Sequence, residues 1–197
     1  TCALPICATL KALPHKDQIR VLVPEGLGAL LQGWGFTQTT EMPWHLSITI
    51  NDVTITSLPA IHHSRRTPFD YNHAHWCSFA IASDAMRIYH AGDTAFGPVF
   101  EQIGRDYGPF DYGLVPVGGY GKNDAHRAVH ATPEDAITIG AATQCTRLIG
   151  MHWGALSITG EPSLEPRTRF HAAASSHGYT AEQIHTLDLG QTITSRS

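Results

Sequence analysis

The 197-residue chain has a formal net charge of -4, with 13 Lys and Arg against 17 Asp and Glu, and 42% of its residues are hydrophobic. This content is enough to bury a core, and the length is typical of one domain. The few basic residues argue against a broad surface for nucleic acid or anionic membranes. No apolar run is as long as a membrane span, and no signal-peptide pattern is present.

Cysteine and histidine are distributed very differently. The four cysteines are scattered without a C-x-x-C pair, so neither a thiolate zinc site nor a disulfide framework is indicated; they are Cys2, Cys7, Cys77 and Cys145. We therefore expect a reducing, cytoplasmic setting. Thirteen histidines are unusual for this length, and histidine is the commonest neutral metal ligand and acid–base group, so their positions need individual inspection.

The first six residues, T-C-A-L-P-I, do not begin with Met and resemble the translation of a common sequencing adapter. We therefore expect residues 1–6 to be a non-native, adapter-derived segment. The whole of 1–197 is then expected to be a single partial domain. A processed or trimmed chain would equally lack the Met.

In chain order, the pattern of apolar residues and turn signals predicts short strands and helices. Strands are expected at 19–23, 46–50, 53–58, 76–83, 86–90, 110–117 and 147–151, with closing strands at 184–187 and 191–194. Helices are expected at 8–13, 25–32, 98–104, 132–143 and 166–177, and Thr132-Pro133-Glu134-Asp135 has the residue order of a helix start. Hairpins come first and β-α units follow, which predicts a mixed α/β sandwich.

Three candidate metal ligands each follow an expected strand. His62 follows 53–58, Asp93 follows 86–90 and His152 follows 147–151, and Gly92 allows a tight turn that presents Asp93. If these strands share one sheet, their ends can converge. Two imidazoles and a carboxylate suit zinc, which binds such atoms at roughly 2.0–2.2 Å. The alternatives are that each histidine makes a local hydrogen bond, and that Asp93 or Thr94 caps the following helix.

The chain also contains a series of short motifs in a fixed order. They are P-A-I-H at 59–62, A-G-D-T at 91–94, F-D at 110–111 with V-P-V-G at 115–118, H-A-T-P-E-D-A at 130–136 and H-W-G at 152–154. This series resembles the metallo-β-lactamase-fold hydrolases, most closely the branch typified by N-acylphosphatidylethanolamine-hydrolysing phospholipase D. The resemblance covers about residues 8–165. The ordered set is specific, whereas any one motif is weak.

The resemblance implies an αββα sandwich with two zinc ions at one edge of the sheets. His62 and His152 would be terminal zinc ligands and Asp93 would bridge both metals. The H-x-H-x-D-H motif that carries further ligands in the family does not occur in this sequence. We therefore expect the first half of the sandwich to be largely missing. Iron or manganese is also compatible with such ligands.

The function implied is a zinc-dependent phosphodiesterase of the phospholipase D type. A metal-bound hydroxide would attack phosphorus, with Asp93 and His130 as catalytic residues. His130 would bind the substrate or protonate the leaving group. The alternative for His130 is an ordinary exposed loop histidine. A lactonase on the same scaffold and a catalytically inactive fragment remain open. The expected partner is a small-molecule or lipid phosphodiester rather than nucleic acid, with at most peripheral membrane contact; self-association into a homo-oligomer stays open.

Two patterns mimic functional motifs. His73-Ala74-His75 has H-x-H spacing, but Trp76 and Cys77 follow where Asp and His would be needed, so we interpret both histidines as non-ligands. The glycine-rich run 118–122 follows a strand like a phosphate-binding loop, but Pro116 and Asn123 occupy positions that such a loop needs for Gly and for Ser or Thr. This loop is expected to overhang the active site instead.

Overall fold

The computed structural model describes residues 4–121, 123–155 and 159–194, and a seven-stranded sheet forms its centre. The strands are adjacent in chain order: β3 (Ser47–Ile50), β4 (Val53–Leu58), β5 (Ser78–Ala82), β6 (Arg87–His90), β7 (Phe110–Pro116), β8 (Cys145–Met151) and β9 (Ile184–His185). Neighbours from β3 to β6 pair antiparallel, and neighbours from β6 to β9 pair parallel.

This pairing gives five strands the same direction. Because β4 and β6 are both antiparallel to β5, they run parallel to each other, and β7, β8 and β9 run with β6. The carboxyl ends of β4, β6, β7 and β8 therefore lie at one edge of the sheet. Loops that follow these strands are held near one another by the sheet itself.

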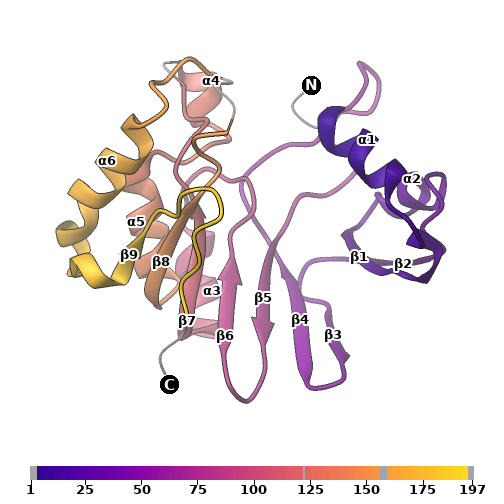
Figure 1. Cartoon of the computed structure of the whole chain (residues 1–197), viewed down its shortest axis with the longest axis horizontal. Helices are drawn as coiled ribbons and strands as arrows, with labels where there is room; N and C mark the ends of the chain where they lie inside the picture. The colour runs from indigo at the N-terminus through magenta and orange to yellow at the C-terminus, as the bar shows by residue number, and fades with distance from the viewer. Residues whose placement is uncertain (1–3, 122, 156–158, 195–197) are drawn as a thin grey trace.

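Helices α3 (Val99–Tyr107), α5 (Pro133–Ala142) and α6 (Glu165–Ala173) pack on one side of the β6–β9 part of the sheet (Figure 1). The main core lies between these helices and the sheet. Its largest side chains are almost fully buried and include Tyr89, Phe110, Ile137, Leu148 and Phe170. Two short 3-10 helices, η2 (Ala174–His177) and η3 (Ala181–Gln183), and the single-turn helix α4 (Asp124–Arg127) complete this part.

The N-terminal part forms a separate small lobe beside the β3–β4 end of the sheet (Figure 1). It contains α1 (Leu4–Ala12), η1 (Lys16–Gln18), β1 (Arg20–Pro24), α2 (Gly28–Gln32) and β2 (Gln38–Met42), with β1 and β2 paired parallel. Val23, Leu31 and Phe36 form its own buried cluster. No helix in the described ranges is long and apolar enough to cross a bilayer.

The sheet face opposite the helices carries a row of apolar side chains. Ile48, Ile55, Ile81, Ile88 and Tyr112 are successive cross-strand partners from β3 to β7, and each is only partly buried. The sheet is thus apolar on both faces, as expected for a layer of a sandwich. That the first half of the sandwich is missing, and that 1–197 is one partial domain, stay predictions.

The predicted mixed α/β class is confirmed, and so are the two hairpins. The strand β2 was not predicted, because Gln38–Met42 is mostly polar and lacks apolar alternation. The strand predicted at 191–194 is wrong: only Ile184–His185 pairs with β8, and the chain then turns at Gly190, whose φ is 82°. Of the expected adapter-derived segment, residues 1–3 lie outside the described residues, and 4–6 begin α1.

The start of α5 has the predicted cap. The Thr132 hydroxyl accepts a hydrogen bond from the Asp135 amide at 3.1 Å, and the Asp135 carboxylate accepts one from the Thr132 amide at 3.0 Å. This reciprocal pair satisfies two backbone donors that the helix itself cannot satisfy. The cap also fixes where the preceding loop, which carries His130, joins the helix.

We predict that Thr132→Ala lowers the free energy of unfolding by about 1 kcal/mol, the usual cost of losing such a cap. The matched control is Thr138→Ala, a partly buried threonine in the middle of the same helix whose hydroxyl bonds to the Glu134 carbonyl, which should change stability by less than about 0.5 kcal/mol. Urea unfolding followed by circular dichroism measures both. Equal effects of the two substitutions would contradict the capping role.

Candidate metal centre

The predicted ligands lie where the sheet directs them. His62 follows β4, Asp93 follows β6 and His152 follows β8, so all three occupy loops at the same sheet edge. His130, in the loop before α5, lies beside two of them: its ring centroid is 5.1 Å from that of His62 and 5.5 Å from that of His152. The convergence predicted from strand ends is therefore present.

The side chain and backbone of Thr94, which is fully buried, connect three of these loops. Its hydroxyl accepts a hydrogen bond from the Ile61 amide at 2.8 Å and donates one to the Ala95 carbonyl at 2.8 Å. Its carbonyl accepts the Ala131 amide at 2.7 Å, and the Ala95 amide bonds to the Ile61 carbonyl at 2.8 Å. Hydrogen bonds to Thr94 thus hold together the loops that carry His62, Asp93 and His130.

The alternative that Asp93 or Thr94 caps the following helix is wrong. Helix α3 begins at Val99 after Pro98, which makes no side-chain cap. The Thr94 hydroxyl is used between loops, and the Asp93 side chain is 49% exposed at the sheet edge. Asp93 is therefore free to face a ligand.

Gly92 makes the turn that presents Asp93, as predicted. Its φ is 66°, and a Cβ atom there would lie 2.6 Å from the Cys77 carbonyl oxygen. Only glycine fits this conformation and spacing without strain. The Gly92 amide also donates to Nδ1 of His90 at 3.1 Å, which stabilises the turn.

Both candidate histidine ligands are fixed in one tautomer. Nδ1 of His62 bonds to the His63 carbonyl at 2.6 Å, and Nδ1 of His152 bonds to the Gly118 carbonyl at 3.1 Å. Because a carbonyl oxygen can only accept, each Nδ1 carries the proton and each Nε2 keeps its lone pair. His152 is further oriented by a left-handed backbone with φ of 60°, an uncommon conformation for a residue other than glycine.

The Nε2 atoms of the two histidines have different surroundings. Nε2 of His152 lies 3.6 Å from a carboxylate oxygen of Asp93. Nε2 of His62 and Nδ1 of His130 are both buried, and neither has a hydrogen-bond partner among the residues that the structure describes. Asp93 and His152 are thus brought together directly, whereas His62 reaches them across the ring of His130.

These observations fit a metal site that the described residues do not complete. Buried nitrogen atoms without partners are costly unless a ligand satisfies them, and imidazole Nε2 with carboxylate is a donor set that zinc accepts. No group of three His, Cys, Asp or Glu side chains within residues 4–121, 123–155 and 159–194 is close enough to hold a metal ion by itself. The donor atoms present are therefore of the types that zinc binds. Further ligands are needed to complete its coordination.

The electrostatic environment of His130 keeps its ring neutral. Burial lowers its pKa to about 4, and the neighbouring imidazoles of His62 and His152 add to this, while Asp93 opposes it. At pH 7 the ring therefore carries no charge. Of the two roles considered for His130, hydrogen bonding to a substrate suits a neutral ring better than donation from an imidazolium.

The two runs that resemble functional motifs have contacts of their own, while their assignment as non-ligands and as an active-site loop stays a prediction. His75 pairs with Glu25 at 3.3 Å and stacks on Trp44, which accounts for it without a metal. The glycine-rich loop lies against the candidate ligands: a Cβ atom on Gly119 would be 2.8 Å from the His152 ring. Lys122 of this loop lies outside the described residues.

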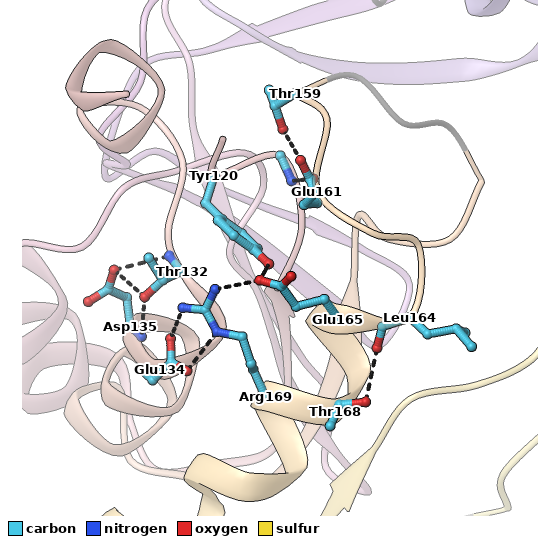
Figure 2. A network of polar contacts seen from close by, with 11 residues as sticks. Tyr120, Thr132, Glu134, Asp135, Thr159, Glu161, Leu164, Glu165, Thr168 and Arg169 are labelled. Atoms are coloured by element: carbon cyan, nitrogen blue, oxygen red, sulfur yellow. Dashed lines mark hydrogen bonds and ion pairs between the residues drawn. The ribbon is translucent and has the colours of Figure 1, made fainter. Parts of the chain in front are cut away.

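A polar network that the sequence did not indicate holds this loop against α6 (Figure 2). Tyr120 donates to Glu165 at 2.9 Å, and Arg169 bonds to Glu165 at 3.0 Å and to Glu134 at 2.6 Å. Beside it, the Gly119 amide donates to Glu161 at 2.6 Å. Glu165 and Arg169 are four residues apart on α6, but the other partners lie 35 to 45 residues apart in sequence, so no local pattern could have revealed those contacts.

Comparison with known proteins agrees with this geometry. Residues 6–153 match the sequence profile of the family described as "Beta-lactamase superfamily domain". The chain belongs to this family, and it has the metallo-β-lactamase fold. It is similar to Igni18, a metallo hydrolase from Ignicoccus hospitalis, with a TM-score of 0.67 at 19% identity over 97% of this chain and 72% of that one.

Curated relatives are more similar to this chain in sequence than Igni18 is. N-acyl-phosphatidylethanolamine-hydrolyzing phospholipase D 1 of Caenorhabditis elegans is 33% identical over 186 residues, which cover 88% of this chain and 52% of that protein. An uncharacterized protein of Mycobacterium tuberculosis is 35% identical over 177 residues, covering 87% of this chain and 47% of that protein. The chain thus spans about half the length of the curated relatives it matches.

We predict that Thr94→Val lowers the free energy of unfolding by about 1–3 kcal/mol, because the Ile61 amide loses its acceptor inside the protein. Thr94→Ser, which keeps the hydroxyl, is the matched control. Hydrogen exchange of the Ile61 amide distinguishes the two: exchange should become faster in the valine variant and stay slow in the serine variant. Equally slow exchange in both would contradict the role given to this hydroxyl.

Proposed function

We propose that the protein from which this chain comes is a zinc-dependent hydrolase that cleaves phosphodiesters in the manner of a phospholipase D. His62, Asp93 and His152 would hold the metal, with Asp93 bridging two ions. Membership of the metallo-β-lactamase superfamily and similarity to a C. elegans phospholipase D support this proposal. We further propose a cytoplasmic location and a small-molecule or lipid phosphodiester substrate, with membrane contact that is peripheral at most.

The observation that carries the proposal is the state of the two imidazoles. Each Nδ1 is engaged by a backbone carbonyl, so each Nε2 offers a lone pair at the sheet edge. Metal-binding histidines characteristically donate their other ring N–H in this way. Asp93, half-exposed and 3.6 Å from His152, adds the carboxylate that the proposed centre requires.

The residues of this chain have distinct tasks in the proposed reaction. When bound, zinc supplies a nucleophile at neutral pH and positive charge for the developing oxyanion. Asp93 and the two histidines fix the position of that charge. His130, neutral and 5.1–5.5 Å by ring centroid from both histidines, would hydrogen-bond a substrate oxygen beside the centre. The loop at Gly119 closes the site on the side of His152.

A second candidate is that this chain alone is catalytically inactive. It is favoured by one observation: within the described ranges no three metal-binding side chains form a closed group. Zinc usually takes four ligands in a structural site and three in a catalytic site. Activity would then require ligands from outside these 197 residues.

Expression of the complete reading frame from which this sequence comes tests the proposed reaction. We expect zinc-dependent release of phosphatidic acid from N-acyl phosphatidylethanolamine, and loss of activity on removal of zinc with a chelator. A sugar-acid lactone is the comparison substrate, because a lactonase could use the same centre. Hydrolysis of the lactone alone would overturn the phospholipase assignment.

Asp93→Ala in the same protein should reduce turnover to background, because the bridging carboxylate is lost. Asp106→Ala, which removes an exposed carboxylate on α3, is the control and should leave turnover within about twofold of the parent. Retained turnover in the Asp93 variant would show that the bridging assignment is mistaken.

A further inference from the structure

We propose that Glu161 is a positioning residue for His152, acting through the peptide group that joins Gly118 and Gly119. This inference rests on the proposed function, since it concerns a candidate metal ligand. Glu161 belongs to the segment before α6, nine residues beyond His152 in sequence, and contributes no atom to the candidate ligand set.

The two sides of a single peptide group connect these residues. The Gly119 amide donates to the Glu161 carboxylate at 2.6 Å, and the Gly118 carbonyl of the same peptide accepts Nδ1–H of His152 at 3.1 Å. A continuous series of hydrogen bonds therefore connects the Glu161 carboxylate, the Gly118–Gly119 peptide and the His152 imidazole. It ends at Nε2, which lies 3.6 Å from Asp93.

Hydrogen bonds in such a chain strengthen one another. A carboxylate that accepts the peptide N–H pushes electron density toward the carbonyl oxygen, which becomes a better acceptor. The stronger bond at Nδ1 makes Nε2 more electron-rich and holds the ring at one angle. Both effects favour metal binding, and loss of such an outer partner typically costs roughly 10–100-fold in metal affinity.

The peptide is closely confined against the histidine. A Cβ atom on Gly118 would lie 2.2 Å from the His152 carbonyl oxygen, and one on Gly119 would lie 2.8 Å from Cε1 of the His152 ring. The glycines thus allow a contact that other residues would block. Gly119 has φ of 81°, so its backbone conformation also favours glycine.

Glu161 is held as a charged acceptor. Partial burial raises the pKa of its carboxyl, but hydrogen bonds from Thr159 and the Gly119 amide, together with the nearby His152, bring it below the usual value. Figure 2 shows the Thr159 hydroxyl directed at this carboxylate, which also accepts the Gly119 amide. The charge is therefore present at neutral pH.

The simpler explanation is that Glu161 only holds the loop in place, as Glu165 does at the first position of α6. Glu165 accepts from Tyr120 and Arg169, whereas the Gly119 amide donates to Glu161. Because both carboxylates hold the same loop to the same segment, Glu165→Gln is a matched control. This substitution weakens the attachment of the loop to α6. It leaves intact the hydrogen bonds that connect Glu161, the Gly118–Gly119 peptide and His152.

The test uses Glu161→Gln, Glu161→Ala and Glu165→Gln in the complete protein. The first readout is the ¹⁵N NMR spectrum of the His152 ring without metal, in which Nδ1 and Nε2 report tautomer and hydrogen bonding. The second is zinc affinity measured by competition with a chelator. Glutamine can still accept the Gly119 amide, so it separates loss of charge from loss of the bond.

We expect Glu161→Ala to shift the His152 ring resonances and weaken zinc binding by roughly 10–100-fold. Glu161→Gln should give intermediate values, and Glu165→Gln should match the parent. Unchanged resonances and affinity in Glu161→Ala, or equal changes in Glu165→Gln, would overturn the proposal. Failure of the proposed function is distinguishable: zinc would then leave the parent His152 resonances unshifted, while the metal-free spectra would still show the effect of Glu161.

Discussion

The buried hydroxyl of Thr94 is the interaction on which the geometry of the site depends most. It accepts the Ile61 amide and donates to the Ala95 carbonyl, and the Thr94 carbonyl receives the Ala131 amide. Strands of a sheet set where loops begin, but they do not fix how the loops lie beyond the last hydrogen bond of the ladder. At this edge one threonine provides that constraint for three loops, because its two oxygen atoms satisfy backbone groups from each of them.

The chemistry then follows from how the imidazoles are held. Backbone carbonyls at His63 and Gly118 take up both Nδ1 protons, and the lone pairs of Nε2 are left for a ligand. Thr94 positions the loop of His62, while the Gly118–Gly119 peptide, supported by Glu161, positions His152. The two histidines are thus oriented by different parts of the fold, and Asp93 lies between them in chain order on a glycine turn. Membership of the superfamily supports the interpretation of this arrangement as a metal site.

Much of the fold and the candidate site could be predicted from the sequence because their signals are local. Strand ends preceding His62, Asp93 and His152, and the cap at Thr132, are visible in short patterns, and the structure places them accordingly. The role of Thr94 could not be predicted, because its partner Ile61 is 33 residues away and a helix cap was an equally reasonable use of a threonine there. Glu161 was missed for the same reason: its partner is a backbone amide 42 residues distant, and backbone partners leave no trace in sequence. The polar strand β2 and the absence of a strand at 191–194 depend on which neighbours are available for pairing.

We propose that His62, Asp93 and His152 are ligands of one metal centre. Anomalous X-ray scattering at the zinc edge, from crystals of the complete protein grown with zinc, tests it most directly. We expect zinc within roughly 2.0–2.2 Å of Nε2 of His62 and of His152, with an Asp93 oxygen in contact with the metal. Zinc bound through other residues, with either Nε2 atom or the Asp93 carboxylate outside bonding distance, would contradict the account.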